Sequence, residues 1–337
     1  MLLPSRVITV DAALRDVTSG SPRARLAAAQ ALGDVADSDH ARVRPALCAA
    51  LEDDVAAVRA EAAASLGEVG GDDAEISAAL VKRLDDGDAG VRQAAAIALG
   101  TLRAAVGFTP LVQALRQGPA DLRFQAAASL VEIDALAAYE PLAAAVGDPD
   151  PQVVGAVALA LGATGDPRAP GLVAHLLDHD DAGVRFDAAY ALAQVGDRRG
   201  AGILAGALVD GGRDWDAVNA LERIGDADAE TASALASLLG RKGSSPEVQA
   251  RAAGAILSID RLGDGRGAHV ERARAHLVAS LDNRRTTVRG VAVDELGKSG
   301  GTWALAPLET LSRRRRGREL ADAIAAAQRA IHERLSR

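Results

Sequence analysis

Cysteine and long apolar runs are scarce in this sequence. Among its 337 residues one is cysteine, Cys48, which excludes an intramolecular disulfide framework and fits a reducing compartment. The longest apolar run, around residues 153–163, has roughly half of the ~20 residues that a membrane helix needs. The N-terminus lacks the basic stretch and the following apolar stretch of a signal peptide. We therefore expect a cytoplasmic protein with no membrane-spanning segment.

The core has to be built almost without aromatic rings. Apolar residues make up 49% of the chain, but phenylalanine, tyrosine and tryptophan together supply only 2%. Alanine, leucine, valine and isoleucine must therefore fill the core, and alanine and leucine are strong helix formers. Strand-favouring aromatic and β-branched runs are nearly absent, so the composition predicts an all-α fold.

Lysine is also scarce, and charge is unevenly distributed. The 38 basic residues include only three lysines, and the formal net charge is -8. Residues 1–260 contain 37 acidic and 22 basic side chains, whereas residues 261–337 contain 9 and 16. The sequence therefore predicts an acidic body with a basic C-terminal end.

The abundant feature of the sequence is a repeated line. It consists of Val-Arg, two variable residues, Ala-Ala, and a leucine near its end, and it occurs at residues 58–67, 91–100 and 184–192. Successive copies are spaced by 29 to 40 residues, which accommodates two short helices and two turns. Weaker copies begin at Ala24, Leu122, Val153, Arg213, Val248 and Val288.

Each copy predicts one helix, and the residues before it predict another. Apolar residues recur within a copy at helical spacing and form one stripe, as in Val58, Ala62, Leu66 and Val69. Aspartate-rich links supply N-caps. Several of the preceding amphipathic stretches begin at a proline, which suits a first turn: Pro110, Pro141 and Pro170. Glycines near the end of the second helix predict C-terminal stops: Gly67, Gly100, Gly162 and Gly196.

This line resembles the HEAT-like repeat named after phycobilisome lyases, whose hallmark is a Val-Arg-x-x-Ala-Ala-x-Ala-Leu-Gly second helix. The resemblance covers nearly the whole chain. It implies a right-handed α-solenoid (superhelix) of about ten two-helix repeats, with first helices on the convex side and second helices lining the concave side. The same repeats occur in lyases, hydroxylases, glycosylases and scaffolds, so the resemblance by itself selects no activity.

The resemblance also implies a ladder of aspartate–arginine pairs between repeats. It would place Asp53 with Arg59, and Asp86 with Arg92. The ladder should be interrupted where other residues replace arginine, at Val154, Asp214 and Gln249.

We expect one solenoid over residues 1–337, with its first repeat at about 6–35 and a divergent capping repeat at 302–335. Glycine-rich breaks cluster where the repeat period loosens. Residues 210–270 are therefore the expected bend.

Three positions of each second helix should point away from the core and onto the concave face. Seven residues of the chain are aromatic, and four of them occupy these positions. We predict a ridge that binds a helix or extended segment of a partner protein. The alternative is that these side chains turn sideways and fill gaps left by alanine. The ridge consists of Ile97, Phe124, Leu159, Phe186, Tyr190, Trp215 and Asn219.

Catalytic and metal-binding patterns are weak. His175 and His179 have metal-ligand spacing, but no third ligand is evident. Cys48 has no assignable catalytic partner. Hydroxylases with HEAT repeats use several His-Glu pairs, and this chain has one, His332-Glu333. We expect no catalytic residue, no metal and no cofactor.

A run of arginines lies between the two helices of the last repeat, at Arg313, Arg314, Arg315, Arg316 and Arg318. Three interpretations stay open for it: a solvated face, contact with an acidic protein partner, and contact with nucleic acid. No aromatic residues interleave with the run, which disfavours base stacking.

The sequence thus predicts a non-enzymatic adaptor that holds a partner segment on its concave face. One alternative, drawn from the resemblance, is a lyase-like accessory subunit that handles a tetrapyrrole or another flat apolar ligand. A second alternative is association with nucleic acid through the arginine run.

Overall fold

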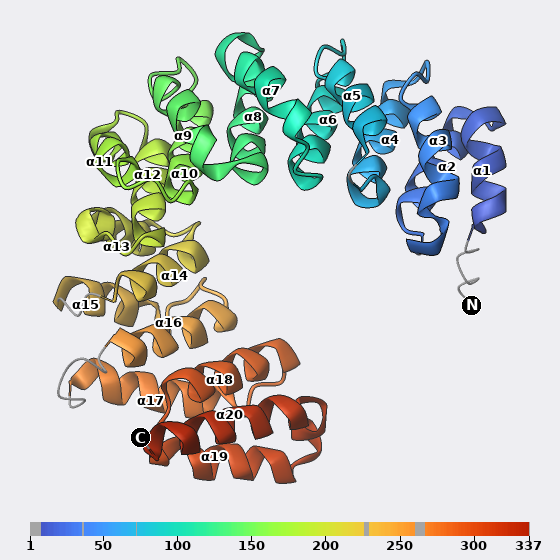
Figure 1. Cartoon of the computed structure of the whole chain (residues 1–337). Helices are drawn as coiled ribbons and strands as arrows, with labels where there is room; N and C mark the ends of the chain where they lie inside the picture. The colour runs from blue at the N-terminus through green and yellow to red at the C-terminus, as the bar shows by residue number, and fades with distance from the viewer. Residues whose placement is uncertain (1–7, 36, 72, 226–228, 260–266, 337) are drawn as a thin grey trace. The chain divides into compact units, whose positions relative to one another are not determined.

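The computed structural model describes residues 8–35, 37–71, 73–225, 229–259 and 267–336 (Figure 1). Over these residues the fold is all-helical, without a β-strand, and the helices follow one another in ten pairs. The predicted all-α architecture of about ten two-helix repeats is confirmed. The chain divides into two compact units, Met1–Val173 (unit 1) and Ala174–Arg337 (unit 2). Each is described by itself.

Unit 1 contains five helix pairs. They are α1 (Val10–Ser19) with α2 (Pro22–Gly33), α3 (His40–Ala50) with α4 (Ala56–Val69), α5 (Ala74–Arg83) with α6 (Ala89–Thr101), α7 (Ala105–Gln117) with α8 (Ala120–Ile133), and α9 (Ala135–Ala144) with α10 (Pro151–Ala163). The short 3-10 helix η1 (Asp37–Asp39) precedes α3, and α11 (Ala169–Ala174) reaches the boundary between the units.

Unit 2 continues the pattern. The 3-10 helix η2 (His175–Asp178) follows α11 and precedes α12 (Ala182–Gln194). The next pairs are α13 (Ala201–Asp210) with α14 (Asp214–Ile224), α15 (Ala229–Leu238) with α16 (Pro246–Ile259), α17 (Ala268–Ser280) with α18 (Thr286–Ser299), and α19 (Thr302–Arg313) with α20 (Ala321–Leu335). The 3-10 helices η3 (Arg198–Gly200) and η5 (Arg315–Leu320) lie before α13 and α20.

Helices pack in two layers within each unit. In unit 1 the second helices α2, α4, α6, α8 and α10 contact one another in succession, and so do the first helices α1, α3, α5 and α7 (Figure 1). In unit 2 the second helices α12, α14, α16, α18 and α20 form a corresponding series. Within each unit, consecutive repeats therefore contact one another, as expected of a helical repeat array.

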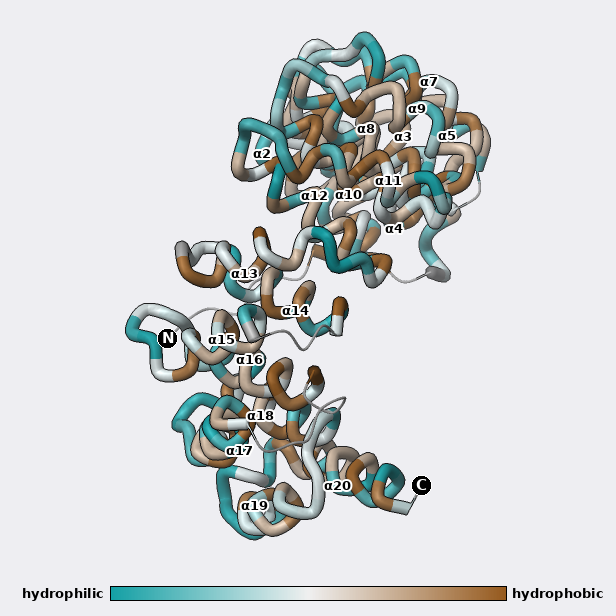
Figure 2. The backbone as a smooth tube through the Cα atoms, turned by 90° about the vertical axis from the view of Figure 1, so that its left-hand side faces the viewer, coloured by the Kyte–Doolittle hydropathy of each residue, from teal (hydrophilic) through white to brown (hydrophobic). Residues whose placement is uncertain are grey.

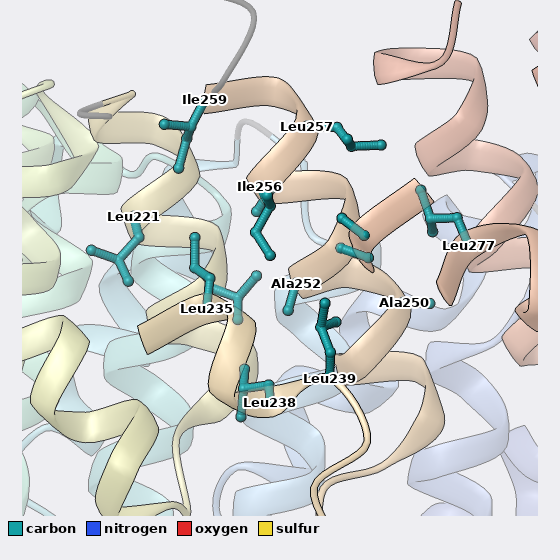
Figure 3. Close-up of a cluster of buried hydrophobic side chains, with 14 of the residues drawn as sticks. Leu221, Leu235, Leu238, Leu239, Ala250, Ala252, Ile256, Leu257, Ile259 and Leu277 are labelled. Carbon is teal, nitrogen blue, oxygen red and sulfur yellow. The ribbon is translucent and has the colours of Figure 1, made fainter. Parts of the chain in front are cut away.

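Alanine and leucine dominate the core between the layers. Among the described residues the buried apolar side chains include two aromatic rings, Tyr139 and Phe186. Along the helices hydrophobic and hydrophilic stretches alternate (Figure 2). Figure 3 shows the pattern in unit 2, where Leu235 and Leu238 of α15 meet Ala252 and Ile256 of α16 in one buried cluster. Small side chains on the second helices leave room for leucines between the layers.

Three glycines that were expected to stop second helices lie inside them instead. Gly67 belongs to α4, Gly100 to α6 and Gly162 to α10. A Cβ atom added at Gly67 would lie 3.2 Å from the Cα of Ala98, and one at Gly100 would lie 3.2 Å from the Cα of Ser129. Gly67 and Gly100 therefore lie where consecutive second helices approach closely. Of the expected stops, Gly196 does follow its helix, with φ of 76°.

The prolines of the first helices also differ from expectation. Pro110 and Pro141 lie inside α7 and α9, which begin at Ala105 and Ala135. The sequence did not predict the preceding turns, because alanine-rich segments such as residues 135–138 have little apolar periodicity. Proline provides no backbone N–H, so each of these helices loses one internal hydrogen bond. Pro170 fits the prediction, as the second residue of α11.

Aspartate–arginine pairs join consecutive repeats, but with a different partner from the one that the resemblance implied. The Asp53 carboxylate does not pair with Arg59, which instead donates to the backbone carbonyl of Asp53 at 2.8 Å. The carboxylate accepts hydrogen bonds from Arg25 of the preceding repeat, at 2.6 Å from Nε and 2.8 Å from Nη2. Arg59 pairs in the same two-pronged way with Asp86, at 2.8 Å for both contacts. Each arginine therefore reaches forward, and the aspartate also accepts the N–H of a turn residue, as Asp53 does from Val55 at 2.9 Å.

The ladder weakens where the sequence departs from aspartate or arginine. Arg92 has Gln117 at the equivalent position of the next repeat and instead pairs through one nitrogen with Asp121, at 2.8 Å. Gln249 replaces arginine and holds its own turn, because its amide donates to the carbonyls of Arg241 and Ser244. The expected interruption at Gln249 is thus confirmed.

The expected bend includes residues 226–228 and 260–266, which lie outside the described residues. Within the rest of that segment, Gly211, Gly212, Gly240 and Gly243 adopt φ values between 81° and 105°, a region that favours glycine. These glycines make the longer turns that were predicted there. The bend and the continuity of one solenoid from residue 1 to 337 stay predictions.

Changing Gly100 to valine should destabilise unit 1, because the new side chain would press on the backbone of α8 at Ser129. We expect a loss of about 1–3 kcal/mol in the free energy of unfolding, measured by urea denaturation. Gly206→Val is the matched control, since Gly206 lies within α13 and a Cβ there has no neighbour within 4 Å. Equal losses in both variants would contradict the close contact.

The pairing of Asp53 predicts a pH dependence. The hydrogen bonds from Arg25 lower the pKa of Asp53 from 3.8 to about 2. This pair therefore stabilises the fold fully above pH ~4, and its contribution is lost as the pH falls from about 4 towards 2. The melting temperature of Asp53→Asn should be lower than that of the wild type at pH 7 and should approach it at pH ~2. Asp54→Asn is the control, because the Asp54 side chain is 84% exposed and its pair with Arg25 should contribute little.

Candidate functional site: the outer faces of the second helices

Three of the predicted ridge residues lie in unit 1, and all three are exposed. The exposed fraction is 48% for Ile97 on α6, 43% for Phe124 on α8 and 39% for Leu159 on α10. These helices pack against one another in that order. For these residues, the outward orientation inferred from helical geometry is confirmed.

The three side chains belong to a row of exposed apolar residues on consecutive second helices. Ala64 on α4 and Ala128 on α8 are also exposed, and they occupy the same helical position as Ile97 and Leu159. Phe124 lies one helical turn before Ala128. We call Ala64, Ile97, Phe124, Ala128 and Leu159 the unit 1 patch. It spans four second helices in succession.

Acidic side chains border the unit 1 patch. Glu68 and Glu132 follow Ala64 and Ala128 by four residues, so each lies one turn further along the same helix face. Both are exposed, as is Asp34 at the end of α2. Glu61 on α4 is half-buried, and burial together with the nearby charge of Asp34 raises its pKa. The unit 1 patch is thus an apolar surface with negatively charged side chains along its edge.

Phe186, the first ridge residue in unit 2, does not face outwards. Its exposed fraction is 7%, and it belongs to the buried cluster of unit 2. Its ring stacks on Tyr190 with centroids 6.4 Å apart, and the Arg213 guanidinium lies 4.5 Å from its centroid. The prediction of an outward Phe186 was wrong, and the alternative holds for it: the ring fills space beside small residues such as Ala189.

The remaining ridge residues of unit 2 differ in exposure. Trp215 on α14 is 42% exposed, whereas Tyr190 and Asn219 are half-buried. Asn219 accepts a hydrogen bond of 2.8 Å from Nε of Arg251. A cavity of about 540 Å³ opens at this point, and its lining includes Tyr190, Gln194, Asn219, Glu222, Arg223, Arg251 and Ser258.

A buried charge cluster forms one wall of this cavity. Arg251 pairs with Glu222 and, at 3.0 Å, with Glu295 of α18. Glu295 is 1% exposed, and burial raises its pKa. Gly254 makes room for it, since a Cβ there would lie 1.9 Å from a carboxylate oxygen. Sequence reasoning missed this cluster, although one signal was present: glutamate occupies a position where the other second helices have alanine or serine, as at Ala98.

Two further cavities lie between first helices, one between α5 and α7 and one between α17 and α19, with volumes of about 610 Å³ and 340 Å³. They occupy equivalent places in their repeats. Leu84 and Pro110 line the first where Leu281 and Pro307 line the second. Because the same position is hollow in both units, these cavities are a consequence of repeat packing around the helix prolines.

The arginine run lies at the end of α19 and in η5 and is exposed. Two of its members pair with acids of unit 2: Arg313 with Glu309 at 2.5 Å, and Arg314 with Asp282. Internal pairing therefore reduces the charge available to a partner. Neither acidic-protein nor nucleic-acid contact is tested by these pairs, and both stay open.

Among the described residues we find neither a metal-binding cluster nor an activated thiol. Within the described ranges no group of three or more His, Cys, Asp or Glu side chains could hold a metal ion. Cys48 is half-buried, and burial raises the pKa of its thiol, the opposite of what an activated nucleophile requires. No helix among the described residues is long and apolar enough to cross a membrane.

Paired helices stacked in two layers, with exposed apolar residues on the second helices, define an α-helical repeat protein with an open surface rather than an enclosed site. The model for HEAT repeats matches residues 12–100 and 108–193, more than half of the chain, and the model for the PBS lyase HEAT-like repeat matches residues 91–117. The protein belongs to the HEAT-repeat family.

Solved structures of three proteins are similar to this chain. An engineered protein is 21% identical, with 96% of this chain and 98% of that chain covered and a TM-score of 0.42. The complex of CpcE and CpcF of phycocyanin lyase from Nostoc sp. PCC7120 is 22% identical, with 82% and 96% covered and a TM-score of 0.40. YibA of Escherichia coli is 19% identical, with 74% and 92% covered and a TM-score of 0.48. A search of curated proteins finds no matching relative.

The different environments of Phe186 and Trp215 predict different costs of truncation. Phe186→Ala should lower the free energy of unfolding by about 3–5 kcal/mol, because it leaves a cavity in the buried cluster. Trp215→Ala should change it by less than about 1 kcal/mol, because that ring is substantially exposed. Chemical denaturation followed by circular dichroism measures both. A large loss for Trp215→Ala would assign that ring to the core.

Proposed function

We propose that the protein is a non-enzymatic scaffold whose unit 1 patch holds a segment of a partner protein. The observation that carries this proposal is the exposure of Ile97, Phe124 and Leu159 on one side of three second helices packed in succession. In a chain with 2% aromatic residues, an exposed phenylalanine within an apolar surface is typical of an interface anchor.

The composition of the unit 1 patch favours binding over chemical conversion. Its five members carry no titratable or nucleophilic group. Helix spacing in such a layer is about 8–10 Å, so the patch offers a series of shallow apolar contacts to an elongated ligand. A segment of another protein has the required length and side-chain variety.

Unit 2 supports a second contact of the same scaffold. Trp215 is exposed, and Tyr190 and Asn219 line a polar cavity beside it. Tryptophan and tyrosine combine an apolar ring with a hydrogen-bonding group, which suits a partly wet interface. The amide oxygen of Asn219 accepts from Nε of Arg251, and the same amide carries two N–H donors.

A triple variant tests the proposal: Ile97→Ala, Phe124→Ala and Leu159→Ala together. Because these side chains are exposed, the helical circular dichroism and the melting temperature should stay close to those of the wild type. Capture of partner proteins from native cell extract should fall at least about tenfold, since hot-spot anchors dominate binding.

The control removes equally exposed apolar side chains from first helices of the same unit, Val106→Ala on α7 and Leu136→Ala on α9, whose exposed fractions are 54% and 71%. Capture by this control should match the wild type. Equal capture by the triple variant and the wild type would overturn the proposal. Retention of a visible absorbance band after addition of bilin, lost only from the triple variant, would instead support a tetrapyrrole ligand.

A further inference from the structure

The second helices of unit 1 carry acids at the end where a helix favours bases. Free carbonyl groups give a helix C-terminus partial negative charge, which is stabilised by cations and destabilised by anions. Yet Glu68 and Glu132 lie in the last turns of α4 and α8, and Asp34 is the C-cap of α2. None of α2, α4, α6, α8 and α10 has a basic residue in its last turn.

Unit 2 shows the usual arrangement on several of its second helices. Arg223 lies in the last turn of α14, Lys298 in that of α18, and His332 and Arg334 in that of α20. The composition of the chain therefore permits cations at these positions. The unit 1 second helices carry no cation of their own there. Arg44 of α3 donates to the carbonyl of Val69 at the end of α4, at 2.6 Å, but the carboxylates of Glu68 and Glu132 form no ion pair among the described residues.

The arginines of the same unit 1 helices are occupied elsewhere. Arg25, Arg59, Arg92 and Arg123 lie in the first turns of α2, α4, α6 and α8 and pair with aspartates near the starts of the following second helices or in the links before them. These positions are at the opposite end of each helix from the acidic border. Among the ion pairs of the described residues, none contains Asp34, Glu61, Glu68 or Glu132.

We propose that the unit 1 patch binds a basic amphipathic helix of a partner protein. This inference rests on the proposed function and specifies the chemistry of the partner. Apolar side chains of the helix lie on Ile97, Phe124 and Leu159, and its lysines and arginines reach Glu61, Glu68 and Glu132. The two contacts are compatible because each border carboxylate lies one helical turn, ~5.4 Å along the axis, from the apolar row.

The spacing of the layer fits such a ligand. Neighbouring helices are about 8–10 Å apart, and residues seven apart on a helix lie ~10.5 Å apart on nearly one face. A ligand helix that crosses α6, α8 and α10 therefore presents an apolar residue to each at every second turn. Burial, and next the charge of Asp34, raise the pKa of Glu61, so a cation brought by the ligand would favour the ionised carboxylate.

The direct test measures binding of synthetic peptides to the full chain by fluorescence anisotropy. The probe is a helical peptide of about 18 residues, long enough to cross three helices, with leucine along one face and lysine elsewhere. Two matched peptides carry glutamate or glutamine in place of lysine. We expect the lysine peptide to bind more tightly than the glutamine peptide, and the glutamate peptide not to bind.

A charge variant locates the site. Glu61→Gln, Glu68→Gln and Glu132→Gln together should weaken binding of the lysine peptide about tenfold at low salt, since three exposed ion pairs are lost. The control removes three acids from the first-helix side of unit 1, Asp16→Asn, Glu75→Gln and Asp85→Asn. It makes the same change in net charge and should weaken binding less than about twofold.

Thermal stability separates recognition from a structural role. The border variant should melt no lower than the wild type, because glutamate at a helix C-terminus destabilises the free protein. Acids that stabilise the fold would instead lower the melting temperature when removed.

Equal binding of the lysine and glutamine peptides, abolished by Ile97→Ala/Phe124→Ala/Leu159→Ala, would overturn the charge inference and leave the scaffold intact. Equal weakening by the border and control variants would show attraction to net charge alone and also overturn it. If none of the peptides binds, and the apolar variant also captures partners as the wild type does, both proposals fail.

Discussion

Close contact between consecutive second helices is the constraint on which the rest of the molecule depends. At Gly67 and Gly100 the space for even a methyl group is limited by the backbone of the next helix. Such contacts require glycine, alanine or serine on the facing sides. The core then takes its volume from leucines between the layers, and bulky side chains are left to the positions that point outwards.

This constraint explains why a few exposed residues carry so much of the functional argument. On a second helix, two sides are committed: one to the neighbouring second helices and one to the first-helix layer. Only the outer side is free to vary. In unit 1 that side combines apolar residues such as Phe124 with carboxylates such as Glu132, neither of which the packing demands. Residues that the fold does not need are the ones whose presence calls for a functional explanation.

The sequence predicted the repeat architecture well because periodicity reports on packing directly. The spacing of Val58, Ala62 and Leu66 defines a buried stripe, and the same geometry placed Ile97, Phe124 and Leu159 on the exposed side. It failed at Phe186, because helical position gives a direction but not the space beside it. Partner choice in the ladder was also wrong: spacing places Asp53 near Arg59 in sequence, but the arginine side chain extends across to the next repeat.

Buried polar residues were the hardest to predict. The cluster of Arg251 and Glu295 joins α16 to α18, and only the three-dimensional neighbourhood shows that Gly254 clears the space for the carboxylate. Glycines in second helices were interpreted as helix stops, because the signals that end a helix are local in sequence. The close approach of two helices, in contrast, depends on residues of both helices. A close approach can be predicted from the sequence only when the residues of both contacting helices are compared.

The forward direction of the arginine–aspartate pairs has a consequence for how such a chain changes in length. The repeat of α3 and α4 illustrates this. Its Asp53 accepts from Arg25 of the repeat before it, and its Arg59 donates to Asp86 of the repeat after it. A duplicated repeat brings both halves of the junction and satisfies its neighbours without any compensating substitution. Duplication of a repeat within the array therefore preserves the arginine–aspartate pairs. A change within one link, such as Gln117 in place of aspartate, affects the pair between two repeats only. Arrays held by polar head-to-tail junctions can thus lengthen freely while individual joints diverge.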